Sequence, residues 1–391
     1  MAEGTCRERS DVIRKANSDS LQFCYSRHGC GYVGQPGVWW RESGAISIVD
    51  EQLAPVEGLM RHVVDTAEAL GLGVVPGRDL PLYGMVRYHL GWAEDDFRLA
   101  AFDPGKRIRP LICLLSCSAA GGDPAQAVPV SAAIELLHNF TLVHDDIQDQ
   151  SEIRRHRRTV WSLWGEGQAI NAGDALFALS QIALLRSTEY HVPPEIVTRL
   201  AVEFNATTLR IAEGQVLDLG FEHRWDIGVD DYLRMIDGKT AAIVGFAGWA
   251  GALIAGSDTE GFRNFGRILG LGFQVRDDLL GIWGSERLTG KPAADDIRRR
   301  KKSLPIIALA AAVSGAELTE LETIYEGNSI GEPAVARVLD LLEQYRIEDQ
   351  IQVQVDQYHD EARAILERIA VPSPARSMLE SLLDRLAVRA S

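Results

Sequence analysis

Apolar residues recur every three or four positions along almost the whole chain after about residue 50. This spacing gathers apolar side chains on one face of a helix. Clusters of Gly, Pro and Asp separate the periodic segments, and no alternating run is long enough to indicate a useful β-strand. The pattern predicts an all-α fold with helices over 52–70, 82–92, 109–120, 128–149, 173–187, 196–219, 230–238, 240–255, 259–284, 303–314 and several segments within 333–390.

Residues 1–49 differ from the rest of the chain. They are rich in Gly, Ser, Arg and Cys, lack clear helical periodicity and include the pair Trp39-Trp40. We therefore divide the chain into an N-terminal extension, 1–49, and a helical domain, 50–391. Three interpretations of the extension stay open: a flexible segment, a partner-binding tail, or sequence upstream of the true start. A scaffold or compartment-cargo role of the extension would be compatible with activity in the domain.

Composition limits the classes of partner. The 391 residues are 46% hydrophobic and carry a formal net charge of −15, which argues against a nucleic-acid-binding protein. An acidic protein that binds polyphosphates must supply positive charge locally. Cys113 and Cys117 lie in an apolar run and are expected to be reduced core residues. The chain has no N-terminal signal-like apolar segment and no uninterrupted apolar run of membrane-spanning length, so we expect a cytoplasmic protein without stable membrane insertion.

Two acidic clusters lie near the ends of long apolar helices. Asp145 and Asp149 are four residues apart and share a helix face about 6 Å apart; His138, seven residues before Asp145, lies on that face. Carboxylates so placed repel one another unless water or a cation intervenes, and hard oxygen ligands suit Mg²⁺. A solvated acidic stripe is the alternative interpretation. A second Asp pair, Asp277-Asp278, in the same context favours the metal.

Short basic segments accompany both acidic clusters. Three cations stand in 105–110, four arginines in 154–158, and five consecutive basic residues in 298–302; Lys239 follows a helix break at Gly238. Each segment alone is most simply a solvated face. Their repeated association with the aspartates instead predicts a site for a metal-bound diphosphate.

Over roughly residues 52–391 the chain resembles the trans-type isoprenyl diphosphate synthases. The resemblance implies a single large helical bundle around a central cavity. Asp145, Asp146 and Asp149 match the family's DDxxD motif, which binds Mg²⁺ and the allylic diphosphate. Asp277 and Asp278 match the second aspartate motif, but Gly281 replaces its last Asp. The paired arginines match Arg154 and Arg155, although the usual Gly-x-Pro-Thr after them reads 156–159 His-Arg-Arg-Thr, so that loop is expected to have a different shape.

The resemblance also assigns roles. It implies about three Mg²⁺ ions per site held by the five aspartates. It places isopentenyl diphosphate against Lys106, Arg109, His138 and Arg155, and the allylic diphosphate against Arg154 and Lys239. The remaining matches are Gln215 and Asp218, Lys291 and Lys301 of the C-terminal diphosphate-binding loop, and Lys239, Thr240 and Gln274, whose oxygen dipoles would steady an allylic carbocation.

The expected reaction is condensation of isopentenyl diphosphate with an allylic diphosphate. Product length should depend on the residues just before the first motif. Thr141 lies nearly beneath Asp145 by helical period, whereas Phe140 is rotated away. A small Thr141 with an aromatic Phe140 resembles geranylgeranyl diphosphate synthases and predicts a C20 product. The alternative is that Phe140 only packs in the core and another helix forms the floor.

Two other functions are alternatives. A class I terpene cyclase on the same fold would ionise an allylic diphosphate but would not need the second diphosphate site. A non-catalytic synthase subunit would not need an intact first motif. The resemblance also implies a homodimer.

Overall fold

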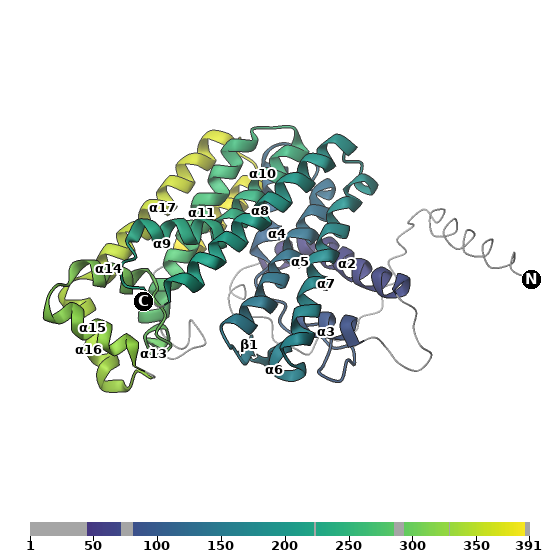
Figure 1. The fold of residues 1–391 in the computed structure, drawn as a ribbon. Helices are drawn as coiled ribbons and strands as arrows, with labels where there is room; N and C mark the ends of the chain where they lie inside the picture. Colours follow the sequence, from purple (N-terminus) through teal and green to yellow (C-terminus); the bar gives the residue numbers. More distant parts are fainter. Residues whose placement is uncertain (1–44, 72–80, 223, 285–292, 328, 388–391) are drawn as a thin grey trace, which may run out of the picture. The chain divides into compact units, whose positions relative to one another are not determined.

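The computed structural model describes residues 45–71, 81–222, 224–284, 293–327 and 329–387. Within these ranges the chain is almost entirely helical (Figure 1). The first helices are α2 (Ala45–Leu70), α3 (Pro81–His89), α4 (Ile108–Ala119), α5 (Pro124–Gln148), α6 (Val160–Trp164), α7 (Glu166–Leu185), the 3₁₀ turn η2 (Arg186–Tyr190) and α8 (Pro194–Phe221). They are followed by α9 (Val229–Ile236), the π-helical turn η3 (Asp237–Ala241), α10 (Ala242–Ala255), α11 (Thr259–Trp283), α13 (Asp295–Arg298), α14 (Leu304–Ala312), α15 (Ala316–Glu326), α16 (Glu332–Gln344), α17 (Ile347–Ile369) and α18 (Pro374–Ala387).

The expected all-α fold is confirmed, with shifted helix ends. The first helix starts at Ala45, seven residues before the expected start and inside the predicted extension. α5 starts at Pro124 because the Asp123 carboxylate accepts a hydrogen bond from the Ala125 amide and caps the helix. The rest of the predicted extension, residues 1–44, lies outside the described residues.

The centre of the bundle is α10, whose residues 243–253 are all buried. It packs against α4 on one side and α11 on the other, and α11 packs in turn on α17. Glycines permit these close approaches: a Cβ on Gly251 would lie 2.7 Å from the Cys117 amide nitrogen of α4. The expected reduced core pair is confirmed, since Cys113 and Cys117 are free and buried. Burial raises the pKa of each thiol to about 12.

α5 and α7 form another extensive helix pair and run antiparallel. Contacts between His144 and Asp174, and between Phe140 and Phe177, fix this direction. A Cβ on Gly173 would overlap the His144 ring, so glycine is what lets α7 approach α5 at this level.

One segment among the described residues, Val229–Ala255, is long and apolar enough to cross a membrane by composition. It comprises α9, η3 and α10, and 72% of its most apolar window is buried inside the protein, as in the core helix of a globular domain.

Candidate active site

The first aspartate cluster lies in the last turn of α5. Asp145 is half-buried and Asp149 is exposed at the C-terminal cap. Carboxylates at a helix C-terminus lie at the negative end of the helix dipole, so a cation there is favourable. Asp146, only 2% exposed, instead pairs with Arg154, whose Nε lies 2.8 Å from its Oδ1. Burial raises the pKa of Asp146 to about 6 against the opposing charge of Arg154.

The second cluster lies near the end of α11 and repeats this division. Asp277 is exposed, whereas Asp278 is 1% exposed and fully engaged by protein donors. Its carboxylate accepts hydrogen bonds from the Tyr232 hydroxyl, from Gln274 Nε2 at 3.0 Å and from the Leu304 amide at 3.2 Å. Asp278 therefore ties α11 to α9 and α14. Each motif thus presents at least one accessible carboxylate beside one that is occupied by the protein.

Lys239 and Thr240 come from the π-helical turn η3 between α9 and α10. Lys239 forms an ion pair with Asp218 of α8. Desolvation lowers the pKa of Lys239, but the charges of Asp218 and Asp145 outweigh it and raise the pKa above its ordinary value. Thr240 Oγ1 donates to Gln274 Oε1 at 2.9 Å, so that amide is fixed between Thr240 and Asp278.

Close helix packing sets the position of this turn. A Cβ on Gly214 of α8 would lie 2.8 Å from the Lys239 Cα, and one on Gly238 would lie 2.7 Å from the Arg210 carbonyl oxygen. Both contacts are shorter than real side chains tolerate. The two glycines therefore let η3 rest directly on α8, which places Lys239 beside Asp218.

The structure also brings together Arg109 and His138. Arg109 Nη1 lies 3.1 Å from His138 Nε2, and Arg109 Nε is buried without a hydrogen-bond partner. Burial, and then the charge of Arg109, lower the pKa of His138 well below its usual range, so the imidazole is neutral and accepts from the guanidinium. Lys106 is exposed nearby; desolvation lowers its pKa, partly offset by the charge of Asp277.

The arginine between Lys106 and Arg109 is engaged by two carboxylates of the protein. Arg107 is 8% exposed and adopts a left-handed conformation with φ 48° at the start of α4. Its guanidinium pairs with Glu135 at 2.7 Å and with Glu57 at 3.0 Å. Sequence reasoning missed both partners, because they lie far away along the chain and match no motif. This ion-pair network anchors the start of α4, with Lys106 just before it and Arg109 in its first turn.

Arg154 and Arg155 lie on a hairpin that periodicity did not predict. Strands β1 (Ile153–Arg154) and β2 (Arg157–Arg158) pair antiparallel, and the two turn residues, Arg155 and His156, have φ of 49° and 61°. Such a turn normally favours Asn-Gly. The guanidinium of Arg155 lies over Gly105, where a Cβ would come within 2.8 Å of its Nη2.

Arg157 holds the hairpin in place. Its guanidinium stacks on the rings of Tyr88 and Phe102 at 3.9 and 3.7 Å from the ring centroids. It also donates to the carbonyl oxygens of Tyr88 and Ala93. These contacts of Arg157 fix residues 156–159, the segment in which the sequence departs from Gly-x-Pro-Thr.

The residues expected to set product length lie on different faces of α5. Thr141 Oγ1 donates to the His138 carbonyl oxygen at 2.8 Å, so its hydroxyl is bound to the backbone of its own helix. Phe140 packs against His144 at 4.8 Å and against Phe177 of α7 at 5.5 Å between ring centroids.

Three further residues were predicted to belong to the site: Gln215, Lys301 and Lys291. Gln215 donates to the Gln148 side chain at 2.7 Å, one residue before Asp149. Lys301 is exposed; desolvation lowers its pKa, but Asp296, Asp278 and Asp277 raise it above its ordinary value overall. Lys291 lies outside the described residues.

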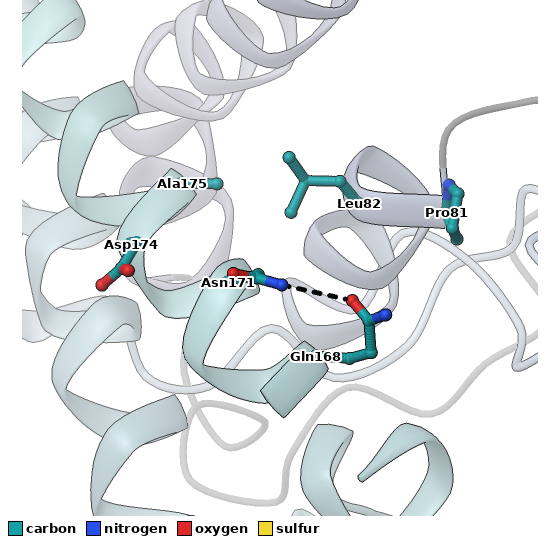
Figure 2. A pocket seen from close by; sticks show the side chains of 6 residues that line it. All are labelled: Pro81, Leu82, Gln168, Asn171, Asp174 and Ala175. Carbon is teal, nitrogen blue, oxygen red and sulfur yellow. Dashed lines mark hydrogen bonds between the residues drawn. The ribbon is translucent and has the colours of Figure 1, made fainter. Parts of the chain in front are cut away.

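One surface pocket lies away from these residues. It has a volume of about 480 Å³ and is lined by Pro81 and Leu82 of α3 and by Gln168, Asn171, Asp174 and Ala175 of α7 (Figure 2). A smaller one, about 30 Å³, is lined in part by Asp146, Arg154 and Arg155. Three of the predicted site residues therefore line the smaller pocket, whereas Asp145, Asp277 and Lys239 line neither of the two.

The accessible donors suit Mg²⁺ by their chemistry. Asp145, Asp149 and Asp277 offer only carboxylate oxygens, which Mg²⁺ prefers, and it leaves its other positions to water and phosphate oxygens. Among the described residues, no three His, Cys, Asp or Glu side chains are close enough to hold a metal by themselves. Carboxylates that leave positions to phosphate oxygens fit ions shared between the protein and a substrate.

Comparisons with known proteins identify the family of the chain. Residues 93–342 match the model of the polyprenyl synthetase family. The chain is 44% identical over 225 residues to a (2E,6E)-farnesyl diphosphate synthase of Mycobacterium tuberculosis, covering 57% of this chain and 61% of that protein. It is 45% identical over 249 residues to a geranylgeranyl diphosphate synthase of the same organism, covering 63% and 70%.

Structural similarity extends further. A crystal structure of a polyprenyl synthetase from Streptomyces coelicolor superposes with a TM-score of 0.78 at 32% identity, covering 88% of this chain and 99% of that one. The match to the farnesyl synthase spans about three fifths of that protein's length. The family model covers well over half of the chain, and the fold agrees along nearly all of it. The chain belongs to the polyprenyl synthetase family.

Proposed function

We propose that the protein is a Mg²⁺-dependent head-to-tail prenyltransferase that condenses isopentenyl diphosphate with an allylic diphosphate. One observation supports the proposal: the described residues include two separate groups that could each hold a diphosphate. Lys239 lies beside Asp218 and Asp145, while Arg109 and His138 form a pair of their own. Two diphosphates need two such groups, whereas a cyclase needs one.

The residues divide the reaction between them. Lys239, Arg154 and Lys301 would draw charge from the departing diphosphate. Bound Mg²⁺ would supply the rest of the neutralisation that makes diphosphate an adequate leaving group. Arg109, His138, Lys106 and Arg155 would orient the isopentenyl substrate so that its double bond attacks the allylic carbon. The Gln274 amide and the carbonyls of Lys239 and Thr240 would steady the cation, and the released diphosphate would accept the proton.

The metal assignment is tested by Asp145→Ala and Asp277→Ala. Each variant should fold but lose at least about 100-fold in kcat, because each removes a ligand from the leaving-group site. Asp360→Ala, an exposed carboxylate on α17, is the control. Near-normal turnover of either variant at saturating Mg²⁺ would show that the aspartates do not hold the metal.

The reaction class is tested by substrate dependence. The protein is incubated with Mg²⁺, each short allylic diphosphate, and isopentenyl diphosphate present or omitted. A prenyltransferase consumes the allylic substrate in proportion to isopentenyl diphosphate and gives longer diphosphates. Consumption without isopentenyl diphosphate would point to a cyclase, and no consumption with either mixture to a non-catalytic subunit.

We further propose geranylgeranyl diphosphate as the product. The sequence identities to a farnesyl and a geranylgeranyl synthase, 44% and 45%, are too close to distinguish a C15 from a C20 product. The proposal rests on Thr141, which is small and lies one turn below Asp145. Thr141→Phe should shorten the product toward C15, and Phe140→Ala should lengthen it beyond C20. If sizing of the products shows no change in either variant, this face of α5 does not set the length.

The partner in solution is proposed to be a second copy of the chain. The support is an apolar face on α7 and α8 on which Leu185, Leu209 and Val216 are exposed. A cytoplasmic location stays a prediction from the sequence.

A further inference from the structure

The guanidinium of Arg157 joins three segments that lie apart along the chain. Its Cζ lies 3.9 Å from the ring centroid of Tyr88, near the end of α3, and 3.7 Å from that of Phe102, in the loop before α4. Its nitrogens donate to the carbonyl oxygens of Tyr88 at 3.0 Å and of Ala93 at 2.7 Å. One planar side chain of the β1–β2 hairpin therefore contacts two aromatic rings and two main-chain oxygens of other segments.

Further hydrogen bonds hold the same three segments together around this guanidinium. The Tyr88 hydroxyl donates to the Arg158 carbonyl oxygen at 2.8 Å, which attaches the hairpin to α3 a second time. The Phe102 amide donates to the Gly91 carbonyl oxygen at 2.9 Å, so the loop returns to the end of α3 at this residue. The two rings are thus placed by the main chain, and Arg157 fills the position beside them.

Two cations that the sequence assigned to isopentenyl diphosphate lie on the joined segments. Arg155 stands in the turn of the hairpin, two residues before Arg157, and Lys106 follows Phe102 by four residues. The Arg155 guanidinium lies on the loop directly before Lys106, because a Cβ on Gly105 would be 2.8 Å from its Nη2 and 2.9 Å from its Cζ. The spacing of Arg155 and Lys106 therefore depends on how the hairpin is held against this loop.

The cations assigned to the allylic diphosphate have anchors of their own. Arg154 lies opposite Arg157 in the hairpin, but its Nε is 2.8 Å from Oδ1 of Asp146, which is 2% exposed. Lys239 lies in η3 and forms an ion pair with Asp218 of α8. These two cations are therefore held by carboxylates of α5 and α8, whereas the hairpin turn is held by the rings of Tyr88 and the loop.

We propose that Arg157 is a positioning residue for the isopentenyl diphosphate, and that it sets the spacing of Arg155 and Lys106 by fixing the hairpin against the loop of Phe102. This inference rests on the proposed function. Two cations that bind one diphosphate must be held at a single spacing, and a small misplacement is costly. A planar guanidinium can stack on two rings and donate to two oxygens at once, which the point charge of a lysine cannot do.

The test measures, by calorimetry with Mg²⁺, the binding of each substrate alone, so that no condensation occurs. Arg157→Lys keeps the charge but loses the stacked plane. Its Kd for isopentenyl diphosphate should rise about 10-fold or more, whereas its Kd for geranyl diphosphate should stay within about threefold of the native value. Arg158→Lys is the matched control, because Arg158 is exposed and donates to the Ser162 carbonyl oxygen of its own segment. Both of its Kd values should be unchanged.

A second variant shows whether the effect passes through the stacked contact. Phe102→Leu removes one ring and should raise the Kd for isopentenyl diphosphate by about threefold or more. Because Arg157 and Phe102 act through one contact, the double variant should bind no more than about twofold more weakly than Arg157→Lys alone. Fully additive losses of binding free energy in the double variant would overturn the inference.

Two other outcomes would overturn it as well. One is native affinity of Arg157→Lys for isopentenyl diphosphate, and the other is an equal loss for both substrates. If Arg157→Lys does not fold, Phe102→Leu decides, and native affinity for isopentenyl diphosphate in that variant refutes the role of Arg157. Wild-type protein that binds isopentenyl diphosphate as described but forms no prenyl product would refute the proposed function and leave the role of Arg157 intact.

Discussion

Arg109 has one nitrogen that is hydrogen-bonded within the protein and another that is not. Its Nη1 is used by His138, while its buried Nε has no protein partner. Burial lowers the pKa of Arg109 somewhat, but an arginine remains charged throughout the usual pH range. A buried guanidinium with an unused donor is costly unless an anion completes it. The isopentenyl diphosphate group is the anion that we propose.

Arg109→Ala and His138→Ala should therefore raise the KM for isopentenyl diphosphate more than the KM for the allylic partner. Each loses a charge-assisted hydrogen bond worth about 1.5–3 kcal/mol, which corresponds to roughly 10- to 150-fold in KM. Steady-state kinetics with each substrate varied in turn measures the split. Arg98→Ala, an exposed arginine paired with Asp96, is the control. Equal effects on both KM values would remove the basis for two separate diphosphate sites.

Among the elements, the contact between α8 and η3 matters most, since it positions Lys239. The Ala242 amide bonds to the Asp237 carbonyl oxygen in the wider π pattern. Such turns often occur at functional sites, because they change which groups a helix presents. The turn here depends on Gly214, where α8 approaches to contact distance.

Gly214→Ala should destabilise the protein by about 1–3 kcal/mol, as for an overpacked core position, and should also reduce kcat by moving Lys239. Gly220→Ala in the same helix is the matched control: nothing lies within 4 Å of its added Cβ, so helix propensity should make it neutral or stabilising by up to about 1 kcal/mol. Denaturant unfolding of the two variants gives the comparison. Similar stabilities for both would mean that α8 does not support the turn.

The elements also show what periodicity can and cannot predict. The helix expected over 259–284 is found at Thr259–Trp283, because its apolar stripe is long and capped by Asp258. α7 begins at Glu166, seven residues before its expected start, since glycines and polar residues hide its first turns. The hairpin of Arg154 and Arg155 has strands of only two residues each, too short for any alternation.

In the candidate site, too, sequence predicts some of the residues and not others. The aspartate motifs, Lys106, Arg109 and His138 follow from spacing and resemblance, because each lies in a contiguous motif. The partners Glu57, Glu135 and Tyr232 do not, because they come from other helices and are chosen by packing. Likewise, sequence did not separate Asp146 and Asp278, which the protein itself engages, from the accessible aspartates beside them.

At the scale of the whole molecule, one exposed apolar face calls for a partner. Val202, Leu209 and Val216 are 67%, 66% and 70% exposed, and their spacing of seven residues keeps them on one face of α8. Ile182 and Leu185 of α7 add to this face near the level of the hydrogen bond between Gln181 and Asn205. A two-fold axis would pair such a stripe with its own copy and bury both at once.

The face predicts a homodimer that a single charge can weaken. Leu209→Glu places a carboxylate at the middle of the stripe, so both copies would bury a charge and dimerisation should weaken by 10-fold or more, at about 1.4 kcal/mol per tenfold. Sedimentation velocity at several protein concentrations measures the change. Val353→Glu, which replaces another half-exposed valine on α17, should leave the association unchanged. A wild-type protein that sediments only as a monomer under assay conditions would refute the dimer. A Leu209→Glu protein that remains as dimeric as the wild type would place the interface on a different face.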